Sequence, residues 1–198
     1  MTGRKGRLFI LSAPTGVGKT TVSTKVLAQM PPQLNLKRVI TYTSRPQRPG
    51  ENDGKDYHFI TAKDFTDRKE QGFFLETNEY DGNWYGSPAS ILADLDQGIS
   101  YLMVVDRSGA LLITQKINQA VLIWLTVSDF NMAEQRLLSR SPSSPEKQEQ
   151  RIMIARREWH AEQQSPFFTY HITNDDGKLD TTVEKICMII RAELSKLS

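Results

Sequence analysis

Short apolar runs alternate along the chain with stretches in which apolar side chains recur at helical spacing. Residues 7–12 predict a strand that leads into a glycine-rich loop, and a helical pattern follows over 20–30. The near-continuous apolar runs, typical of strands buried on both faces of a parallel sheet, are residues 101–105 and 120–127. We also expect helices at 88–97, 109–118 and 181–197 and a strand at 168–173. The alternation predicts an α/β fold, an open parallel sheet covered by helices.

Local signals place one of these helices. Ser87 followed by Pro88 has the pattern of an N-cap and a first-turn proline, and Gly98 lies at the far end. The pattern predicts that residues 88–97 are helical and precede the strand at 101–105.

Two segments depart from the alternation. Short strands at 38–43, 57–60 and 74–80, with a turn-rich loop and a helix at 62–71, indicate an inserted subdomain. The second segment is charged and helical, with a Ser-Pro-Ser-Ser-Pro break at 141–145 that is typical of a flexible joint. We therefore expect one domain. Its core comprises 1–37, 88–130 and 165–198, its inserted subdomain 38–87, and its mobile lid 131–164.

Composition and charge limit the classes of protein to which the chain could belong. With 198 residues, 38% of them hydrophobic, the chain can bury one core without metals or disulfides. Its net charge of +2 gives no reason to expect a nucleic-acid groove or a membrane surface. The single cysteine, Cys187, fits a reducing cytoplasm, and the basic N-terminus lacks an apolar stretch long enough for a signal or a spanning helix. Whether the protein is a monomer or a homo-oligomer stays open.

A phosphate-binding loop follows the first strand. Such a loop needs glycines so that backbone N–H groups can turn toward the anion, a lysine for the outer phosphates and a hydroxyl for Mg²⁺. Gly16, Gly18, Lys19 and Thr20 supply these between a strand and a helix, although Ala13 replaces the usual first glycine. The residues predicted to bind a nucleoside triphosphate are Ala13, Pro14, Thr15, Gly16, Val17, Gly18, Lys19, Thr20 and Thr21.

Residues 41–59 gather hydroxyls, two arginines and a tyrosine around tight turns. The planar guanidinium of arginine can hold two phosphate oxygens at once, so the segment indicates a second anion site rather than a basic surface loop. The run from Thr43 to Phe59, Thr-Ser-Arg-Pro-Gln-Arg-Pro-Gly-Glu-Asn-Asp-Gly-Lys-Asp-Tyr-His-Phe, resembles the signature of the guanylate kinase family, which transfers phosphate from ATP to GMP. The resemblance extends over residues 8–174.

The resemblance implies how GMP would be bound by the inserted subdomain. Arg45, Arg48, Tyr57 and Tyr85 match the positions that hold the acceptor phosphate. Glu76 matches the carboxylate that reads guanine, and an ionised carboxylate accepts both N1–H and the 2-amino group. Thr41 and Ser87 match hydroxyls that donate to guanine O6, and Asp106 matches a second acid that helps bind the base. Adenine would leave these groups mispaired.

The lid also resembles that of these kinases. Arg136, Arg140 and Arg151 match arginines that reach over the phosphates, although a charge-rich helix is usually only a solvated face. Asn174 matches an asparagine that approaches the adenine of ATP, and its surroundings are also those of an ordinary turn. The residues expected to act in catalysis are Lys19, Arg45, Arg140 and Arg151.

Phosphoryl transfer to an anionic oxygen needs alignment and charge neutralisation, and no general base. Mg²⁺ is expected as cofactor, held partly by Thr20. Two positions depart from the family pattern, because Val104 replaces an acid and Ser108 a glutamine. Two outcomes therefore stay open. Loss of the acid would reduce activity, or water ligands of Mg²⁺ would compensate for the missing acid.

Two other functions are compatible with the fold. A guanylate-kinase-like interaction module would have lost catalysis, but Lys19, Thr20, Arg140 and Arg151 favour an enzyme. A kinase for another phosphorylated acceptor, such as a ribose phosphate, would have no use for Glu76 and Ser87. The sequence therefore predicts an ATP:GMP phosphotransferase.

Overall fold

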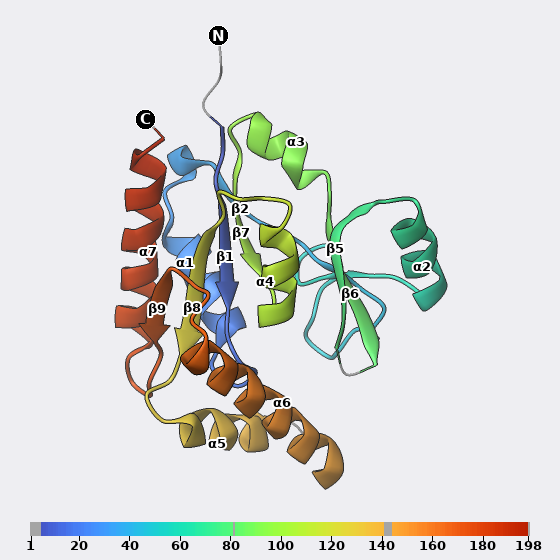
Figure 1. Cartoon of the computed structure of the whole chain (residues 1–198), viewed down its shortest axis with the longest axis vertical. Coiled ribbons are helices and arrows are strands. Elements are labelled where there is room, and N and C mark those ends of the chain that lie inside the picture. The colour runs from blue at the N-terminus through green and yellow to red at the C-terminus, as the bar shows by residue number, and fades with distance from the viewer. Residues whose placement is uncertain (1–4, 81, 141–143, 198) are drawn as a thin grey trace.

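The structure, a computed structural model, describes residues 5–80, 82–140 and 144–197, with the side chain of Arg140 outside the description. Its main sheet has five parallel strands in the order β2-β7-β1-β8-β9. In that order the strands are Leu36–Arg38, Ser100–Val104, Leu8–Ser12, Val121–Thr126 and Tyr170–Thr173. The central strand β1 is flanked by β7 and β8 (Figure 1), so the loop that follows β1 opens at the middle of the sheet's carboxyl edge.

Helices cover both faces of this sheet because successive β1 side chains point to opposite sides. Phe9 and Leu11 pack in a core with α1 (Lys19–Gln29) and α7 (Leu179–Ser195). Leu8 and Ile10 pack on the other face. The helices of that face are α3 (Ile91–Asp96) and α4 (Arg107–Thr114). A short 3₁₀ turn, Pro32–Leu34, leads from α1 to β2.

A second sheet lies to one side of the core (Figure 1). Its strand order is β4-β3-β6-β5, and the strands are His58–Phe59, Tyr42–Thr43, Asn83–Pro88 and Phe74–Tyr80. Helix α2 (Ala62–Glu70) packs on it through Phe65, whose ring stacks on Phe74 at 4.5 Å. This small aromatic core lets the second sheet form a unit of its own beside the main sheet.

Two helices span the predicted lid, α5 (Phe130–Arg140) and α6 (Pro145–Gln164). The carboxyl half of α6 is tied to the core by Glu162, whose side chain is 2% exposed. Glu162 accepts hydrogen bonds from Arg107 Nε and from the N–H groups of Phe167 and Phe168, and it contacts His171 Nε2 at 3.0 Å. Burial alone would raise the pKa of Glu162, but these donors together hold it below its usual value.

Replacing Glu162 with alanine should lower the free energy of unfolding by about 3 kcal/mol, because it leaves a half-buried arginine and two amides without their acceptor. Because the pKa of Glu162 is depressed in the folded state, its contribution should be present above the pKa of a free glutamate and lost as the pH falls below it. Urea unfolding at neutral pH measures the difference. Glu149→Ala, on the exposed part of the same helix, should change stability by less than about 0.5 kcal/mol.

The expected parallel sheet and its covering helices are confirmed, but several local expectations differ from the structure. Residues 83–88 form β6, so Ser87 is no N-cap and Pro88 ends a strand; α3 begins only at Ile91. The Ser87 N–H is taken by the Glu76 carboxylate of β5, which favours the strand over a helical turn. The strand expected at 38–43 is divided between the two sheets, in β2 and β3, and α4 begins at Arg107 rather than at residue 109. Of the break expected at 141–145, residues 141–143 lie outside the described residues.

Candidate active site

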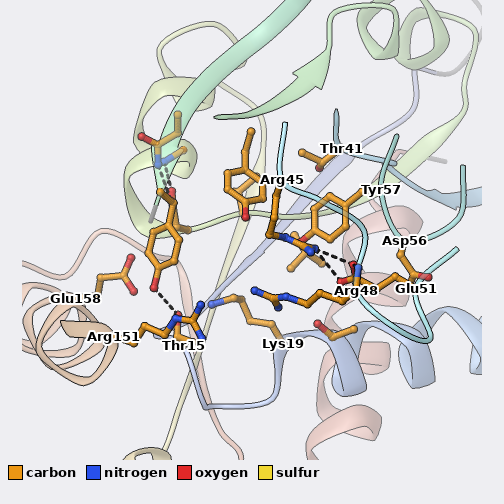
Figure 2. A pocket seen from close by; sticks show the side chains of 18 of the residues that line it. Thr15, Lys19, Thr41, Arg45, Arg48, Glu51, Asp56, Tyr57, Arg151 and Glu158 are labelled. Atoms are coloured by element: carbon orange, nitrogen blue, oxygen red, sulfur yellow. Dashed lines mark hydrogen bonds and ion pairs between the residues drawn. The ribbon is translucent and has the colours of Figure 1, made fainter. Parts of the chain in front are cut away.

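A cavity of about 400 Å³ lies where the phosphate loop, the second sheet and α6 meet. Figure 2 shows the side chains of Lys19, Arg48 and Arg151 converging in its middle, with Glu158 to one side and Tyr57 to the other. The predicted site residues that line it are Thr15, Lys19, Thr20, Thr41, Arg45, Arg48, Tyr57, Glu76, Tyr85, Asp106 and Arg151. Residues predicted for the donor and for the acceptor therefore share one cavity.

The loop between β1 and α1 requires its glycines. Gly16 and Gly18 have φ values of 92° and 103°, in the left-handed region that side chains rarely adopt. A Cβ on Gly16 would lie 2.6 Å from the carbonyl oxygen of Ala133, and one on Gly18 would lie 2.9 Å from Asn174 Nδ2. The methyl group of Ala13 is fully buried in the core, so alanine is accommodated at the first loop position. The amino end of α1 thus faces the cavity, as anion binding at a helix start requires.

Lys19, the first residue of α1, is the half-buried cation of this loop, and its Nζ donates to the Ala13 carbonyl. Burial lowers the pKa of Lys19, and the charges of Glu158 and Asp106 oppose that change. Burial also raises the pKa of Glu158 to about 7, against the opposing charge of Lys19. This end of the cavity therefore holds a cation and nearby acids, an arrangement that suits phosphates accompanied by a metal ion.

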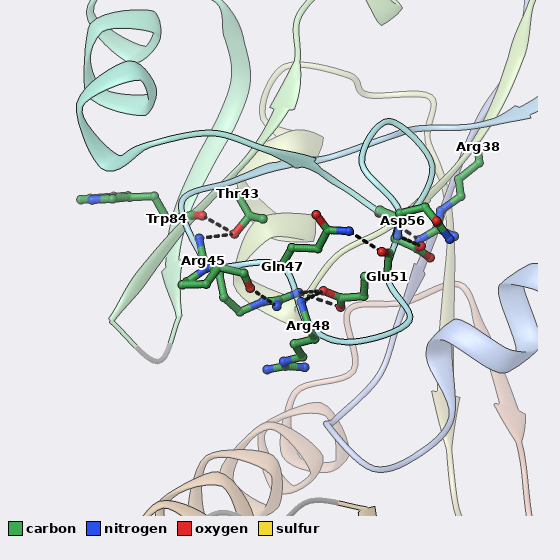
Figure 3. Close-up of polar contacts among 10 residues, drawn as sticks. Arg38, Thr43, Arg45, Gln47, Arg48, Glu51, Asp56 and Trp84 are labelled. Atoms are coloured by element: carbon green, nitrogen blue, oxygen red, sulfur yellow. Dashed lines mark hydrogen bonds and ion pairs between the residues drawn. The ribbon is translucent and has the colours of Figure 1, made fainter.

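Arg45, 8% exposed, is held rigidly on the side of the cavity predicted to bind the acceptor. Its NH2 donates to both carboxylate oxygens of Glu51, at 2.8 and 3.0 Å, and its NH1 to the Pro46 carbonyl at 2.7 Å (Figure 3). Its Nε–H is buried and has no acceptor among the described residues. The exposed Arg48 follows in the same loop, where its own N–H donates to Glu51. The pair thus offers one fixed and one adaptable guanidinium.

Two tyrosines border this arginine pair. The Tyr57 ring lies 6.0 Å from that of Tyr85, and the Arg45 guanidinium lies 5.4 Å over Tyr57. Burial raises the pKa of Tyr57, and the neighbouring Tyr85 adds to the rise. The hydroxyl of Tyr57 therefore stays protonated at neutral pH and can donate a hydrogen bond to an anion.

Two carboxylates converge beside Gly109 at the other end of the acceptor side. A Cβ on Gly109 would lie 3.1 Å from Asp106 Oδ1 and 3.7 Å from Glu76 Oε2. Glu76 is 7% exposed, and its Oε1 accepts the N–H and hydroxyl of Ser87, at 3.1 and 2.8 Å. Burial raises the pKa of Glu76 to about 7; Asp106 adds to the rise and the Ser87 bonds oppose it. A pair of acids with accepting oxygens suits a ligand edge that carries several N–H donors.

Some predicted residues lie outside the cavity wall. They are Ala13, Pro14, Gly16, Val17, Gly18, Thr21, Ser87, Arg136 and Asn174. Ser87 acts on Glu76 instead of on the cavity. Arg136 and Asn174 both donate to the Val17 carbonyl, at 3.4 and 2.7 Å, so they brace the phosphate loop from behind. The side chain of Arg140 lies outside the described residues, so its predicted role stays a prediction.

Comparison with known proteins decides the family. The sequence profile of the family described as "Guanylate kinase" matches residues 5–193. The chain belongs to the guanylate kinase family. It is 37% identical to a guanylate kinase of Streptococcus agalactiae over 190 residues, 96% of this chain and 88% of the relative. It is 36% identical to one of Desulfotalea psychrophila over 194 residues, 97% and 92% of the two chains.

A solved structure agrees with this assignment. The crystal structure of guanylate kinase from Anaplasma phagocytophilum superposes with a TM-score of 0.77 at 27% identity, over 98% of this chain and 88% of that one. The resemblance to guanylate kinases seen in the sequence is thereby confirmed for the family and the fold. The parallel sheet with its covering helices is that of a guanylate kinase.

Several cavity residues were given no role by the sequence. They include Arg38, Glu51, Asn78, Tyr80 and Glu158. Tyr80 ends β5, and its hydroxyl lies 3.1 Å from Thr15 Oγ1, so the second sheet contacts the phosphate loop directly. Strand alternation places Asn78 and Tyr80 on the face of Glu76, which is the signal that would have found them. Glu158 gives no such signal because it lies in a charged helix far along the chain.

Proposed function

We propose that the cavity binds ATP and GMP together and that its residues carry out the activity of the family, transfer of the γ-phosphate of ATP to GMP to give ADP and GDP. One observation carries the residue assignment. A single cavity joins Lys19 and Thr20 at the amino end of α1 to Arg45, Arg48 and Glu76 from the second sheet and its loops. In-line transfer requires donor and acceptor phosphates to meet in such a shared space.

The transfer needs little from the protein beyond placement and charge. An oxygen of the GMP phosphate attacks the γ-phosphorus, the bond to the bridging oxygen breaks, and ADP leaves with that electron pair. Arg45 and Arg48 hold the attacking phosphate, while Lys19 and Arg151 balance the charge that spreads over the transferring group. The attacking oxygen is already anionic, so no side chain has to remove a proton. Closure of the lid helices would keep water from the γ-phosphate.

The residues present can supply the proposed Mg²⁺ with only a few protein ligands. Among the described residues no cluster of three or more His, Cys, Asp or Glu side chains could hold a metal ion. Val104 lines the cavity in place of an acid, whereas Thr20 and Glu158 line it with oxygen atoms. Mg²⁺ commonly keeps several waters and binds through substrate phosphates with one or two protein groups. We propose that Thr20 holds the ion directly and that Glu158 accepts hydrogen bonds from its waters; the ion would neutralise charge on the β- and γ-phosphates.

Glu158→Gln should then raise the Mg²⁺ concentration that gives half-maximal activity about tenfold, because a carboxylate is lost from the outer shell. Titration of Mg²⁺ at fixed ATP measures it, and calorimetry of ATP binding across the same Mg²⁺ range gives a readout independent of turnover. Glu149→Gln, exposed on the same helix, should leave both curves unchanged. An unchanged Mg²⁺ requirement in Glu158→Gln would remove Glu158 from the metal site.

The raised pKa of Glu76 predicts a pH dependence of GMP binding. Burial raises that pKa to about 7, and only the ionised carboxylate can accept two guanine donors. The KM for GMP should therefore be about tenfold higher at about pH 6 than at about pH 8. The GMP phosphate also titrates near pH 6, so the same series on Glu76→Gln isolates the contribution of Glu76. A wild-type profile that matches the variant's would contradict the assignment.

A ligand that fills both halves of the cavity tests the shared site. An adenosine and a guanosine joined 5′ to 5′ through a chain of phosphates should bind with one molecule per chain and compete with both ATP and GMP. Replacing Lys19 or Arg48 with methionine should each weaken its binding in calorimetry. Competition with only one of the two nucleotides would overturn the shared cavity.

The two alternative functions are not favoured. The cavity contains the lysine and the arginine, Lys19 and Arg151, that a non-catalytic interaction module has no need to keep. An acceptor without a base, such as a ribose phosphate, would make no use of Glu76 and Asp106 in the cavity. Nucleic acid is not expected as a partner, and the described residues contain no helix that is long and apolar enough to cross a membrane. A cytoplasmic location stays a prediction that rests on the single cysteine.

A further inference from the structure

Asn78 lies on β5, two residues beyond Glu76, so the two side chains share one face of the strand and both line the cavity. Its amide nitrogen Nδ2 donates to Asp106 Oδ2 at 2.5 Å and to Ser108 Oγ at 2.9 Å. Both partners belong to the junction between β7 and α4. Asn78 thus links the second sheet to the segment that carries the second acid of the cavity.

The Asp106 carboxylate is fixed at both oxygens. Oδ1 accepts the Gly109 N–H at 2.6 Å and the Ser108 hydroxyl at 3.0 Å, which makes Asp106 the N-cap of α4. Those two donors belong to the first turn of α4, whereas the bond to Oδ2 comes from Asn78 in the second sheet. Because an amide is neutral, it orients the carboxylate without neutralising it, and each carboxylate oxygen can accept more than one hydrogen bond.

The hydrogen-bond donors of guanine match this arrangement of carboxylates. The edge carries N1–H and a 2-amino group with two hydrogens. Glu76 can accept N1–H and the nearer amino hydrogen, which leaves the second amino hydrogen directed away from Glu76. Asp106 converges with Glu76 beside Gly109 and is the next carboxylate along this wall.

We infer that Asn78 is a specificity-determining positioning residue, which holds Asp106 Oδ2 where it accepts the second hydrogen of the 2-amino group. The inference rests on the proposed role of Asp106 in binding the base. Its consequence is that Asn78 contributes to binding of 2-aminopurine nucleotides and contributes nothing to binding of 6-oxopurines that lack the 2-amino group. A tie that merely joined the second sheet to α4 would affect both ligands alike.

The test compares dissociation constants of GMP and IMP, since hypoxanthine differs from guanine only in lacking the 2-amino group. Asn78→Ala should raise the Kd of GMP about tenfold in calorimetry, and that of IMP by less than about twofold. The KM for ATP should not change. Thr77→Ala is the matched control, because Thr77 is half-buried on the opposite face of the same strand. Equal weakening of GMP and IMP, or no weakening of GMP, would overturn the inference.

Two further variants separate this inference from the proposal on which it rests. Asp106→Asn should also lower the preference for GMP over IMP; if it does not, Asp106 does not read the 2-amino group and both claims are wrong. If Asp106→Asn lowers the preference and Asn78→Ala does not, only the role of Asn78 is wrong. Asn78→Asp keeps the shape of the side chain but places a second carboxylate against Asp106. It should weaken GMP more than Asn78→Ala does, and an unchanged GMP affinity would contradict the inference.

Discussion

Replacing Lys19 with methionine should lower kcat for phosphoryl transfer about 10³-fold, the loss typical of removing a preorganised charge from a transition state. Lys19 begins α1, its Nζ reaches back to the Ala13 carbonyl, and burial in the cavity lowers its pKa. Methionine keeps most of the apolar stem but cannot balance the charge of the transferring group. A coupled assay of ADP formation at saturating ATP and GMP measures the change.

The matched control is Lys25→Met, because Lys25 lies on the same helix but is exposed and paired with Asp180 at 2.9 Å. That variant should keep its kcat within about twofold of wild type. GMP binding, followed by calorimetry, should persist in Lys19→Met, which separates a lost charge from a lost fold. A Lys19→Met enzyme within about tenfold of wild-type kcat would contradict the assignment of the phosphate loop.

Replacing Glu76 with glutamine should raise the KM for GMP about 100-fold, because two charge-assisted hydrogen bonds are lost and an amide donor then faces a guanine donor. The substitution keeps the volume of the side chain. It also keeps an oxygen that can accept the Ser87 hydroxyl, which is 2.8 Å from Glu76 in the wild-type protein. Steady-state kinetics with GMP varied, and then with ATP varied, measure the effect on each substrate.

ATP should be unaffected, since Glu76 lies on the acceptor side. Glu79→Gln, on the same strand with an exposed side chain, should change neither KM. A rise in the KM for ATP equal to that for GMP would indicate general damage to the cavity, and an unchanged KM for GMP would remove Glu76 from the base site.

Elements whose determinants are local could be predicted from the sequence. The loop after β1 was predictable because its two glycines adopt left-handed backbone conformations that other residues avoid, and both positions are sterically closed to a Cβ. Strand β5 was predicted with its observed ends, Phe74 and Tyr80. By contrast, Ser87 and Pro88 carried a valid local signal for a helix start that was overridden by antiparallel pairing with the preceding strand, β5.

The parts of the site that the sequence did not predict depend on contacts between distant segments. Because Arg136 lies in a helix of the lid, it was predicted to reach over the phosphates. In the structure its guanidinium instead donates to Asp176 at 2.6 Å and to the Asn174 carbonyl at 3.0 Å. Glu158 lies in a charged helix that reads as a solvated face until the fold brings it to Lys19. Asn78 reaches Asp106 across 28 positions of sequence. Such pairings follow from topology, which one sequence does not specify residue by residue.

We propose that one cavity both transfers phosphate from ATP to GMP and selects guanine through its acidic wall. The most direct measurement is ADP formation by the wild-type chain with ATP and Mg²⁺, using GMP, AMP, UMP and ribose 5-phosphate in turn as acceptor. We expect turnover with GMP and a kcat/KM at least about 10³-fold lower with each of the others. Absence of both turnover and calorimetric binding with GMP, or equal turnover with AMP, would contradict it.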